Sequence, residues 1–437
     1  MSLIYIGFMQ FPTALVARLI RLVSCLMLAC ALLPGLGQAQ AANLASPVEV
    51  VLTADQAELQ LGPSMQALED ASGQLDAATA FTRPLVWQAQ RNPSINFGFS
   101  SSAWWTKVTL RNTSTRDLER VLDLGSSLVD HADIHVFRAD GTEVQRMVSG
   151  DRAPFSSRSE NVRSIAMRLS IPAGQAITVL MRFKSHDGLN EIITPTLYAP
   201  EAFTSHVQME TLAFGIYYGL LASVLLYNIF LFASTGQTAF GLYSLYVGSF
   251  LLWGLIFRGY AFQYWWPDSP DFNNQALAVV VSVLYMSLGL FLMKYLDTAR
   301  SVPRWMHRLI AISSAAQGIC FLPAFLNVYA GTFILNSLIG SCTIVSMVII
   351  LHKLVWQGSK PGRYAATAFA ILALAALLYY LRILGFVPAN ALTDNLLQIG
   401  SAAEAMLLAF GLADQMNTLK TQKLRAERQA LAAQTAL

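Results

Sequence analysis

Cysteine and charge are both scarce in this chain, and their scarcity excludes several classes of protein. Only four cysteines occur in 437 residues, and all of them lie in apolar stretches. The polar segment 42–205 has none, which excludes disulfides and cysteine-based zinc sites from it. Charged residues make up 13% of the chain, about half the usual share of a soluble domain. These figures predict a membrane protein.

Signals of catalysis and of nucleic-acid binding are also missing. The net charge is only +3, and the basic residues do not cluster as a phosphate-binding surface would require, so no nucleic-acid partner is expected. The sequence shows no Ser/His/Asp arrangement, no catalytic carboxylate pair and no phosphate-binding loop. We therefore expect no enzymatic activity within this chain and no cofactor.

The N-terminus has the three parts of a secretory signal peptide. Arg18 and Arg21 precede an apolar run over residues 22–33, and Ala39-Gln40-Ala41 follows as a small-x-small cleavage site. This pattern predicts a signal peptide over residues 1–41. An uncleaved anchor and lipidation at Cys30 are the alternatives.

Seven apolar runs are long enough to cross a bilayer as helices. They cover residues 209–233, 238–257, 275–297, 306–327, 331–356, 362–384 and 393–415. Lysine and arginine concentrate in alternate connections and in the tail, at positions 300, 304, 308, 353, 360, 363, 420, 423, 425 and 428. Because such loops stay in the cytoplasm, we expect the N-terminal segment outside and the C-terminus inside.

Polar side chains within these runs are expected to face the interior of the bundle, because each is costly against lipid. They are Asn228, Gln317, Asn336, His352, Arg382 and Glu404. Glu404 lies near the middle of the seventh run and is interpreted either as a functional intramembrane charge or as a neutral packing carboxyl. Arg382 lies near the outer end of its run and is interpreted as an anchor whose side chain can reach the interface.

Two other seven-helix functions can be compared with these runs. A retinal photoreceptor needs a lysine in its last helix for the Schiff base, and residues 393–415 contain none. A transporter is expected to show inverted or parallel repeats and helices broken by glycine or proline, and an odd count of seven runs with no visible repeat supports that function poorly. A receptor is favoured, and a transporter or channel that uses Arg382 and Glu404 is the alternative.

The polar segment is typical of an antiparallel β sandwich. Between residues 50 and 197, short alternating runs are separated by turn signals such as Asp140-Gly141. We therefore predict a periplasmic β-sandwich sensor domain over residues 42–205, a transmembrane region over 206–415 and a cytoplasmic signalling helix over 416–437.

Three features of this segment could bind a ligand. His131, Asp133 and His135 share one face of a strand and could hold a metal, although a solvated sheet face has the same pattern. The stretch with Asp151, Arg152, Arg158 and Arg163 could hold an anionic or sugar-like ligand, with solvated loop charge as the alternative. Trp104 could stack on a sugar ring. Trp104 and Trp105 point to opposite faces of a strand, so at least one of them is expected in the core.

The order of many short motifs resembles the bacterial seven-transmembrane receptors with diverse intracellular signalling modules, with their second type of extracellular domain. In the polar segment these motifs are Ala103-Trp104-Trp105-x-Lys107-x-Thr109-Leu110-x-Asn112, Leu122-x-Leu124, Asp130-His131-x-Asp133, Gly150-Asp151, Pro154-Phe155, Arg158 and Tyr198-Ala199-Pro200-Glu201-Ala202-Phe203. In the apolar half they are Gly215-Ile216-Tyr217-Tyr218-Gly219, Leu226-Tyr227-Asn228, Leu242-Tyr243 and Gln263-Tyr264-Trp265-Trp266-Pro267.

The resemblance implies a receptor with a jelly-roll sensor domain, similar to carbohydrate-binding modules, for a small-molecule or glycan ligand. In that family the last helix often continues into a diguanylate cyclase or a histidine kinase, whereas only 23 residues follow Asp414 here. Their apolar positions alternate in steps of four and three, which favours a coiled-coil helix and a homodimer, with a fraying helix as the alternative. Either the receptor is truncated or split, or this helix signals to a separate cytoplasmic partner. A membrane-anchored glycan-binding envelope protein is the remaining alternative.

Overall fold

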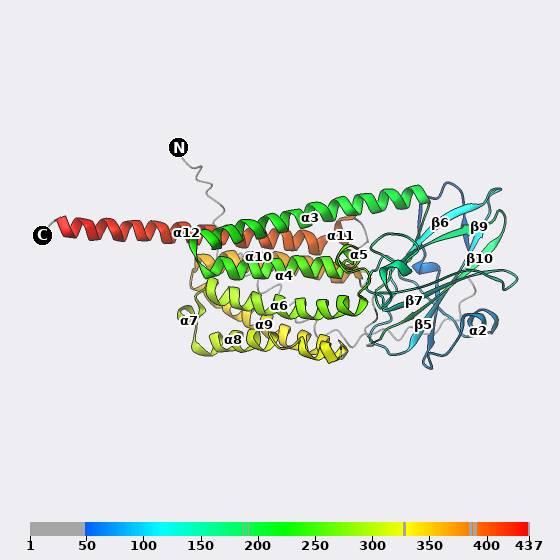
Figure 1. Cartoon of the computed structure of the whole chain (residues 1–437), viewed down its shortest axis with the longest axis horizontal. Helices are drawn as coiled ribbons and strands as arrows, with labels where there is room; N and C mark the ends of the chain where they lie inside the picture. The colour runs from blue at the N-terminus through cyan, green and yellow to red at the C-terminus, as the bar shows by residue number, and fades with distance from the viewer. Residues whose placement is uncertain are drawn as a thin grey trace.

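The computed structural model describes residues 49–435 except residues 187, 189, 191, 327, 328, 384–386 and 388–390. These residues form a β domain and a helical bundle arranged end to end (Figure 1). The expected signal peptide over residues 1–41 lies outside the described residues.

Two sheets make up the β domain. The strands are β1 (Glu49–Leu52), β2 (Glu58–Gln60), β3 (Gln66–Asp70), β4 (Gln88–Ala89), β5 (Ala103–Asn112), β6 (Leu118–Asp123), β7 (His131–Arg138), β8 (Glu143–Ser149), β9 (Ala166–Ile171), β10 (Ala176–Lys184) and β11 (Thr196–Tyr198). One sheet has the order β4-β3-β5-β10-β7-β8, with β1 paired to β5, and the other has the order β2-β11-β6-β9. Apart from the parallel pair β1 and β5, the pairs between these strands are antiparallel, which confirms the predicted β-rich fold.

Alternation along the central strands β5 and β10 places apolar side chains on both faces of the larger sheet. Val108 and Val179 belong to the main core that also includes Leu122 of the smaller sheet. Trp105 and Leu180 point the other way, into a second core covered by α2 (Ala77–Thr82). Both faces of the larger sheet are therefore covered by apolar packing.

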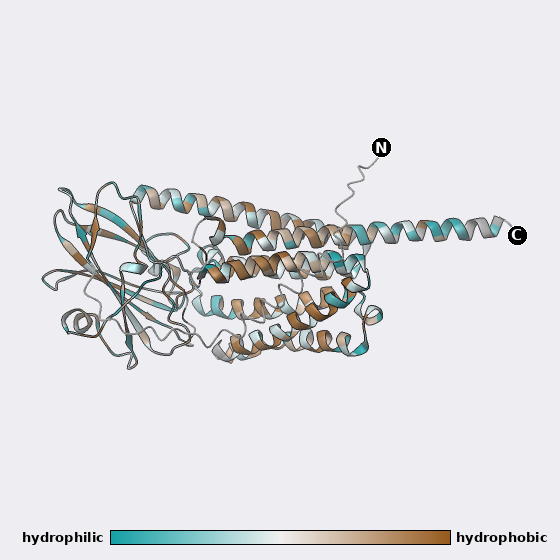
Figure 2. Cartoon of the chain, turned by 180° about the vertical axis from the view of Figure 1, so that it is seen from behind, coloured by the Kyte–Doolittle hydropathy of each residue, from teal (hydrophilic) through white to brown (hydrophobic). Residues whose placement is uncertain are grey.

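The remaining helices form the bundle. They are α3 (Pro200–Thr235), α4 (Thr238–Phe257), α5 (Tyr260–Tyr264), α6 (Pro270–Tyr295), α7 (Thr298–Ser301), α8 (Arg304–Gln317), α9 (Tyr329–Trp356), α10 (Lys360–Ile383), α11 (Ala391–Asp394) and α12 (Leu396–Thr435). Two short 3-10 segments are Phe155–Ser157, between β8 and β9, and Leu322–Leu326, between α8 and α9. Seven helical stretches of the described chain are long and apolar enough to span a membrane, which confirms the seven predicted crossings. Figure 2 shows the apolar residues concentrated in this bundle.

The helix α3 leaves the β domain almost without a linker. It begins at Pro200, two residues after β11 ends, and the backbone N–H of Ala199 donates to Ala57 O at 2.8 Å. In its first turn Phe203 packs with Tyr198, Val121 and Ala166 of the smaller sheet. The first turn of α3 is therefore packed directly on the smaller sheet.

The helix α12 is continuous from within the bundle to far beyond it. Inside the bundle it packs against α10, α3 and α4, and its C-terminal part projects from the end opposite the β domain (Figure 1). This projecting part is mostly hydrophilic (Figure 2).

Candidate functional site between the β domain and the bundle

The segment 150–165, which joins β8 to β9, lies against the loop region around α5. Phe155 N donates to Pro267 O at 2.8 Å, and Gln263 Nε2 donates to Asn161 O at 3.2 Å. Nearby, Ser127 Oγ donates to Phe257 O at 3.3 Å. These bonds dock one edge of the β domain on the end of the bundle.

Gly259 permits this close docking. It has a φ of 83°, at the start of α5, and a Cβ at this position would collide with Ser127 and crowd the carbonyl of Arg163. A side chain here would be strained by the backbone conformation and would separate the two parts.

Arg158 is buried within this interface. Its guanidinium donates to Ser127 O at 3.2 Å and to Arg163 O, and it lies 4.6 Å from the ring centroid of Phe155 and 5.7 Å from that of Phe262 on α5. Burial lowers the pKa of Arg158 to about 10, so the side chain remains a cation at neutral pH. Arg158 therefore holds two backbone carbonyls and two aromatic rings together through its charge.

Arg163 connects the β domain with α3. Its Nε donates to Glu210 Oε2 at 2.8 Å, and a terminal nitrogen donates to the other carboxylate oxygen. The guanidinium also lies 5.8 Å from the ring centroid of Phe214, one turn further along α3, and Arg258 approaches the same ring at 5.0 Å. Such a two-point ion pair fixes both distance and orientation.

A group of hydroxyl contacts inside the bundle connects α3 and α4 with α12. Tyr217 of α3 and Ser401 of α12 are hydrogen-bonded at 2.8 Å. Tyr243 of α4 donates to Ala405 O, and Tyr246 donates to Glu404 Oε1 at 3.1 Å. At the end near the β domain, the side-chain amide of Gln398 in α12 lies against Arg258, and its oxygen accepts from the guanidinium in the amide orientation that gives both amide atoms a partner. The helix α12 is thus held by three tyrosines and one arginine.

The polar residues predicted to face the bundle interior mostly do so. Asn228, Gln317, Asn336 and Glu404 are buried, and Asn228 Nδ2 donates to Val224 O at 2.8 Å. A second group of polar contacts links α6, α8 and α9, because Asn336 accepts from Ser282 and Gln317. Arg382 is partly buried in the last turn of α10.

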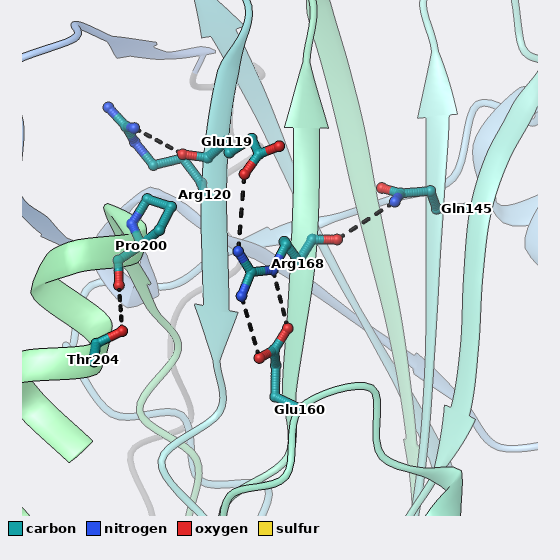
Figure 3. A network of polar contacts seen from close by, with 7 residues as sticks. All are labelled: Glu119, Arg120, Gln145, Glu160, Arg168, Pro200 and Thr204. Atoms are coloured by element: carbon teal, nitrogen blue, oxygen red, sulfur yellow. Dashed lines mark hydrogen bonds and ion pairs between the residues drawn. The ribbon is translucent and has the colours of Figure 1, made fainter. Parts of the chain in front are cut away.

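The four candidates of the basic stretch have different surroundings. Asp151 is buried beside Asp130, and Arg152 Nε lies 3.7 Å from Asp130 Oδ1. Arg158 and Arg163 bond to the protein itself at the interface, so they are poorly placed to bind an external ligand. Figure 3 shows the guanidinium of Arg168 between the carboxylates of Glu119 and Glu160. The side chain of Arg168 is 49% exposed.

A small cleft in the β domain lies next to Asp130. It is lined by Phe97, Val129, Asp130, Phe183, Lys184, Ser185, Asn190 and Ile193. Trp104 stacks on Phe97 with 4.7 Å between ring centroids and supports this wall from behind. Trp105 is 1% exposed in the second core, which confirms that at least one of the two tryptophans is a core residue.

The three side chains considered for a metal have other partners or are exposed. His135 Nδ1 lies 2.8 Å from Glu143 Oε1, Asp133 pairs with Arg182 at 3.4 Å, and His131 is exposed. Among the residues that the structure describes, no group of three or more His, Cys, Asp or Glu side chains is arranged to hold a metal ion. The metal interpretation of this strand is therefore not supported.

The sequence alone did not indicate that Glu210 and Phe262 contact the β domain or that Tyr217 contacts α12. Glu210 offered a signal, because it is the only charged residue between positions 209 and 233 of the first apolar run. Its partner Arg163 is 47 positions away, so the spacing along the chain did not reveal the ion pair.

A β domain that is anchored to seven candidate membrane helices, with a long helix leaving the opposite end, defines an integral membrane protein of receptor type. Residues 210–415 match the family described as 7TM diverse intracellular signalling, and residues 62–194 match the 7TMR-DISM extracellular 2 domain. Together these matches cover more than half of the chain, and the chain belongs to this 7TMR-DISM family. No curated protein matches it.

Proposed function

We propose that this chain is a transmembrane signalling receptor in which α3 relays the state of the β domain to α12. One observation carries the proposal: α3 bonds to the β domain through Glu210 and to α12 through Tyr217, only seven positions, or two helical turns, apart. A shift or rotation of α3 therefore acts on both contacts together, and such a relay requires two alternative packings of the bundle.

The distribution of basic residues supports a bacterial inner-membrane location with the β domain in the periplasm. The β domain contacts the connection around α5, which contains a single basic residue, Arg258. The connections that contain Arg300, Arg304, Lys353 and Lys360 follow odd-numbered crossings and belong to the other end. By the positive-inside rule, that end and the tail of α12 are cytoplasmic.

The cleft beside Asp130 is proposed as the ligand site of the β domain. The cleft is small, with room for about one water-sized group, so a ligand such as a sugar would bind at its mouth, with an apolar face against Phe97 and Phe183 and hydroxyl groups toward Asp130 and Asn190. Trp104 contributes by supporting Phe97. The projecting part of α12 is proposed to pass the signal to a cytoplasmic output module or partner, as a coiled-coil homodimer.

A chimaera tests the relay without knowledge of the ligand. We would fuse a diguanylate cyclase domain of known activity after Leu437 and measure cyclic dinucleotide formation in cells. Tyr217→Phe and Arg163→Met are expected to change the basal output at least threefold, because each removes one of the two polar contacts, with α12 and with the β domain, on which the proposed relay depends. Arg168→Met, on the exposed surface, serves as the control. Unchanged output in both relay variants, at normal expression, would refute the relay.

A thermal-shift screen of the full chain in detergent tests the ligand site. The probes are neutral sugars, sugar acids and inorganic phosphate, and a specific binder raises the unfolding temperature because it binds only the folded state. The Phe97→Ala variant is expected to lose the shift. A shift that persists in this variant would place the ligand elsewhere.

A further inference from the structure

Two carboxyl groups meet at the start of the segment 150–165. Asp151 is 2% exposed, and its carboxyl lies within hydrogen-bonding reach of the carboxyl of Asp130. The backbone holds them there, because Asp151 N donates to Val129 O at 2.8 Å and Arg152 N donates to Asp130 O at 3.4 Å. A Cβ on Gly150 would collide with the carbonyl of Asp130, so glycine permits this close approach.

One buried carboxyl oxygen of this pair has no hydrogen-bond partner among the described residues. Asp130 Oδ2 accepts from Ser185 Oγ at 3.1 Å and from His186 N at 2.6 Å, whereas Asp151 Oδ1 has no hydrogen-bond partner among the described residues. Two carboxylates in contact cannot both remain ionised without strong repulsion, and a shared proton removes that repulsion. Burial and then the neighbouring Asp130 raise the pKa of Asp151 well above its usual value.

Other charged groups around the pair modulate its titration. Arg152 and Arg158 face Asp151 and favour its ionised form. His131 lies near Asp130 and Arg152, and partial desolvation of its ring lowers the pKa of His131, which favours the neutral imidazole. His186 lies on the far side of Asp130 and donates its backbone N–H to that carboxyl. The net effect still favours the protonated pair.

The same segment carries the contacts that dock the β domain on the bundle. Phe155, Arg158, Asn161 and Arg163 all lie within twelve positions of Asp151. Asp130 also lines the cleft that is proposed as the ligand site. The pair therefore lies between the cleft and the interface with the helices.

We propose that Asp130 and Asp151 share a single proton, and that loss of this proton loosens the segment 150–165 from the bundle, so that the receptor responds to external pH. The proton site stands on the backbone contacts that bring the two residues together and on the buried Asp151 Oδ1, which has no partner among the described residues, whereas its effect on signalling rests on the proposed function. A carboxyl with a raised pKa in the folded state stabilises that state at low pH, and this stabilisation is lost as the pH rises through the raised value.

Two measurements on the full chain in lipid nanodiscs test the proposal. The first is the unfolding temperature of wild type and Asp151→Asn between pH 5 and pH 8. Because the pKa of Asp123 is also raised by burial, the readout is the difference between the two proteins. Between pH 5 and pH 8, the unfolding temperature of wild type is expected to fall by at least about 3 °C more than that of Asp151→Asn. Asp133→Asn, on the neighbouring strand, is the matched control and is expected to follow wild type.

The second measurement follows the docking itself. Cysteines are placed at Asn161 and Gln263, with the native cysteines replaced by serine, and a short bismaleimide that spans the length of the lost Gln263 side chain joins them when the segment is docked. The cross-linking yield in the wild-type pair is expected to equal that with Asp151→Asn at pH 5 and to fall at least twofold below it at pH 8. Comparison at each pH cancels the dependence of thiol reactivity on pH. Neither readout requires signal output, so a failed relay and a failed proton site are distinguishable.

The proposal would be overturned if the unfolding temperature and the yield of the linked cysteine pair each depended on pH in the same way in wild type and in Asp151→Asn. If Asp151→Asn does not fold, Asp130→Asn takes its place, and it is expected to give the same loss of pH dependence because the two groups hold one proton between them.

Discussion

Arg163 and Glu210 illustrate how much a single ion pair can depend on its surroundings. Their side chains are 9% and 22% exposed, so water screens them far less than it screens Arg168, whose side chain is 49% exposed. A pair with this burial costs free energy to desolvate, and it recovers that cost only while both partners are present. The pair is therefore sensitive to the loss of one member.

The first prediction concerns this sensitivity. Arg163→Met leaves the carboxylate of Glu210 without its cation and is expected to lower the free energy of unfolding by about 3 kcal/mol. The double variant Arg163→Met with Glu210→Met is expected to recover most of that loss, because no uncompensated charge remains. Denaturant titration of the full chain in detergent measures both values. Equal losses in the single and double variants would contradict this account.

The basic stretch shows what a sequence can reveal at the scale of single residues. The sequence indicated Arg158 and Arg163 as candidate ligand-binding residues, but it could not show whether they bind a ligand or the protein itself. Their partners are backbone carbonyls and Glu210, which only tertiary packing brings near. For Trp104 and Trp105, by contrast, strand alternation was enough to predict opposite faces.

At the scale of elements, α3 differs from the other helices of the bundle. Only 11% of its apolar window is buried within the chain, against 33–44% for the other six. Its few buried residues include Phe203, Phe214, Leu221 and Asn228. With so little of α3 buried, the hydrogen bond between Tyr217 and Ser401 is one of the specific contacts that fix α3 relative to α12.

The second prediction tests that contact. Tyr217→Phe removes only the hydroxyl and is expected to destabilise the bundle by about 0.6–1.7 kcal/mol, as measured for hydrogen bonds between membrane helices. Tyr227→Phe, on the same helix with an exposed side chain, is the control and is expected to have no effect. Unfolding by sodium dodecyl sulfate from mixed micelles measures the difference. An equal effect of the two variants would refute a special role of Tyr217.

The seven crossings were predictable from the sequence because hydrocarbon demands long apolar runs, whatever the packing between helices. The residues at which the helices begin and end were less predictable. The first helix starts at Pro200, nine positions before its apolar run, because Phe203 and neighbouring residues pack on the smaller sheet rather than in lipid. The short helix α5 was not predicted, since its five residues are positioned by docking against the β domain.

At the scale of the whole molecule, seven crossings place the two ends of the bundle in different compartments. The β domain docks at the end that contains α5, and α12 projects from the other end (Figure 1). Most of the basic loop residues lie at this second end, so the charge pattern and the packing favour one orientation. A signal that crosses the bilayer through this chain requires that arrangement.

The last prediction is the orientation itself. Alkaline phosphatase folds only outside the cytoplasm, so a fusion after Leu437 is expected to be inactive and a fusion after Asp268 to be active. Green fluorescent protein that is exported in unfolded form does not fluoresce outside the cytoplasm. Its fusion is therefore expected to fluoresce after Leu437 and to stay dark after Asp268. The connection at Gly358, between the fifth and sixth crossings, is expected to behave like Leu437, because an even number of crossings separates them. Reporter activity at Leu437 and Asp268 in the same compartment would remove the physical basis of the relay, since α3 and α12 would then connect two surfaces on one side of the membrane.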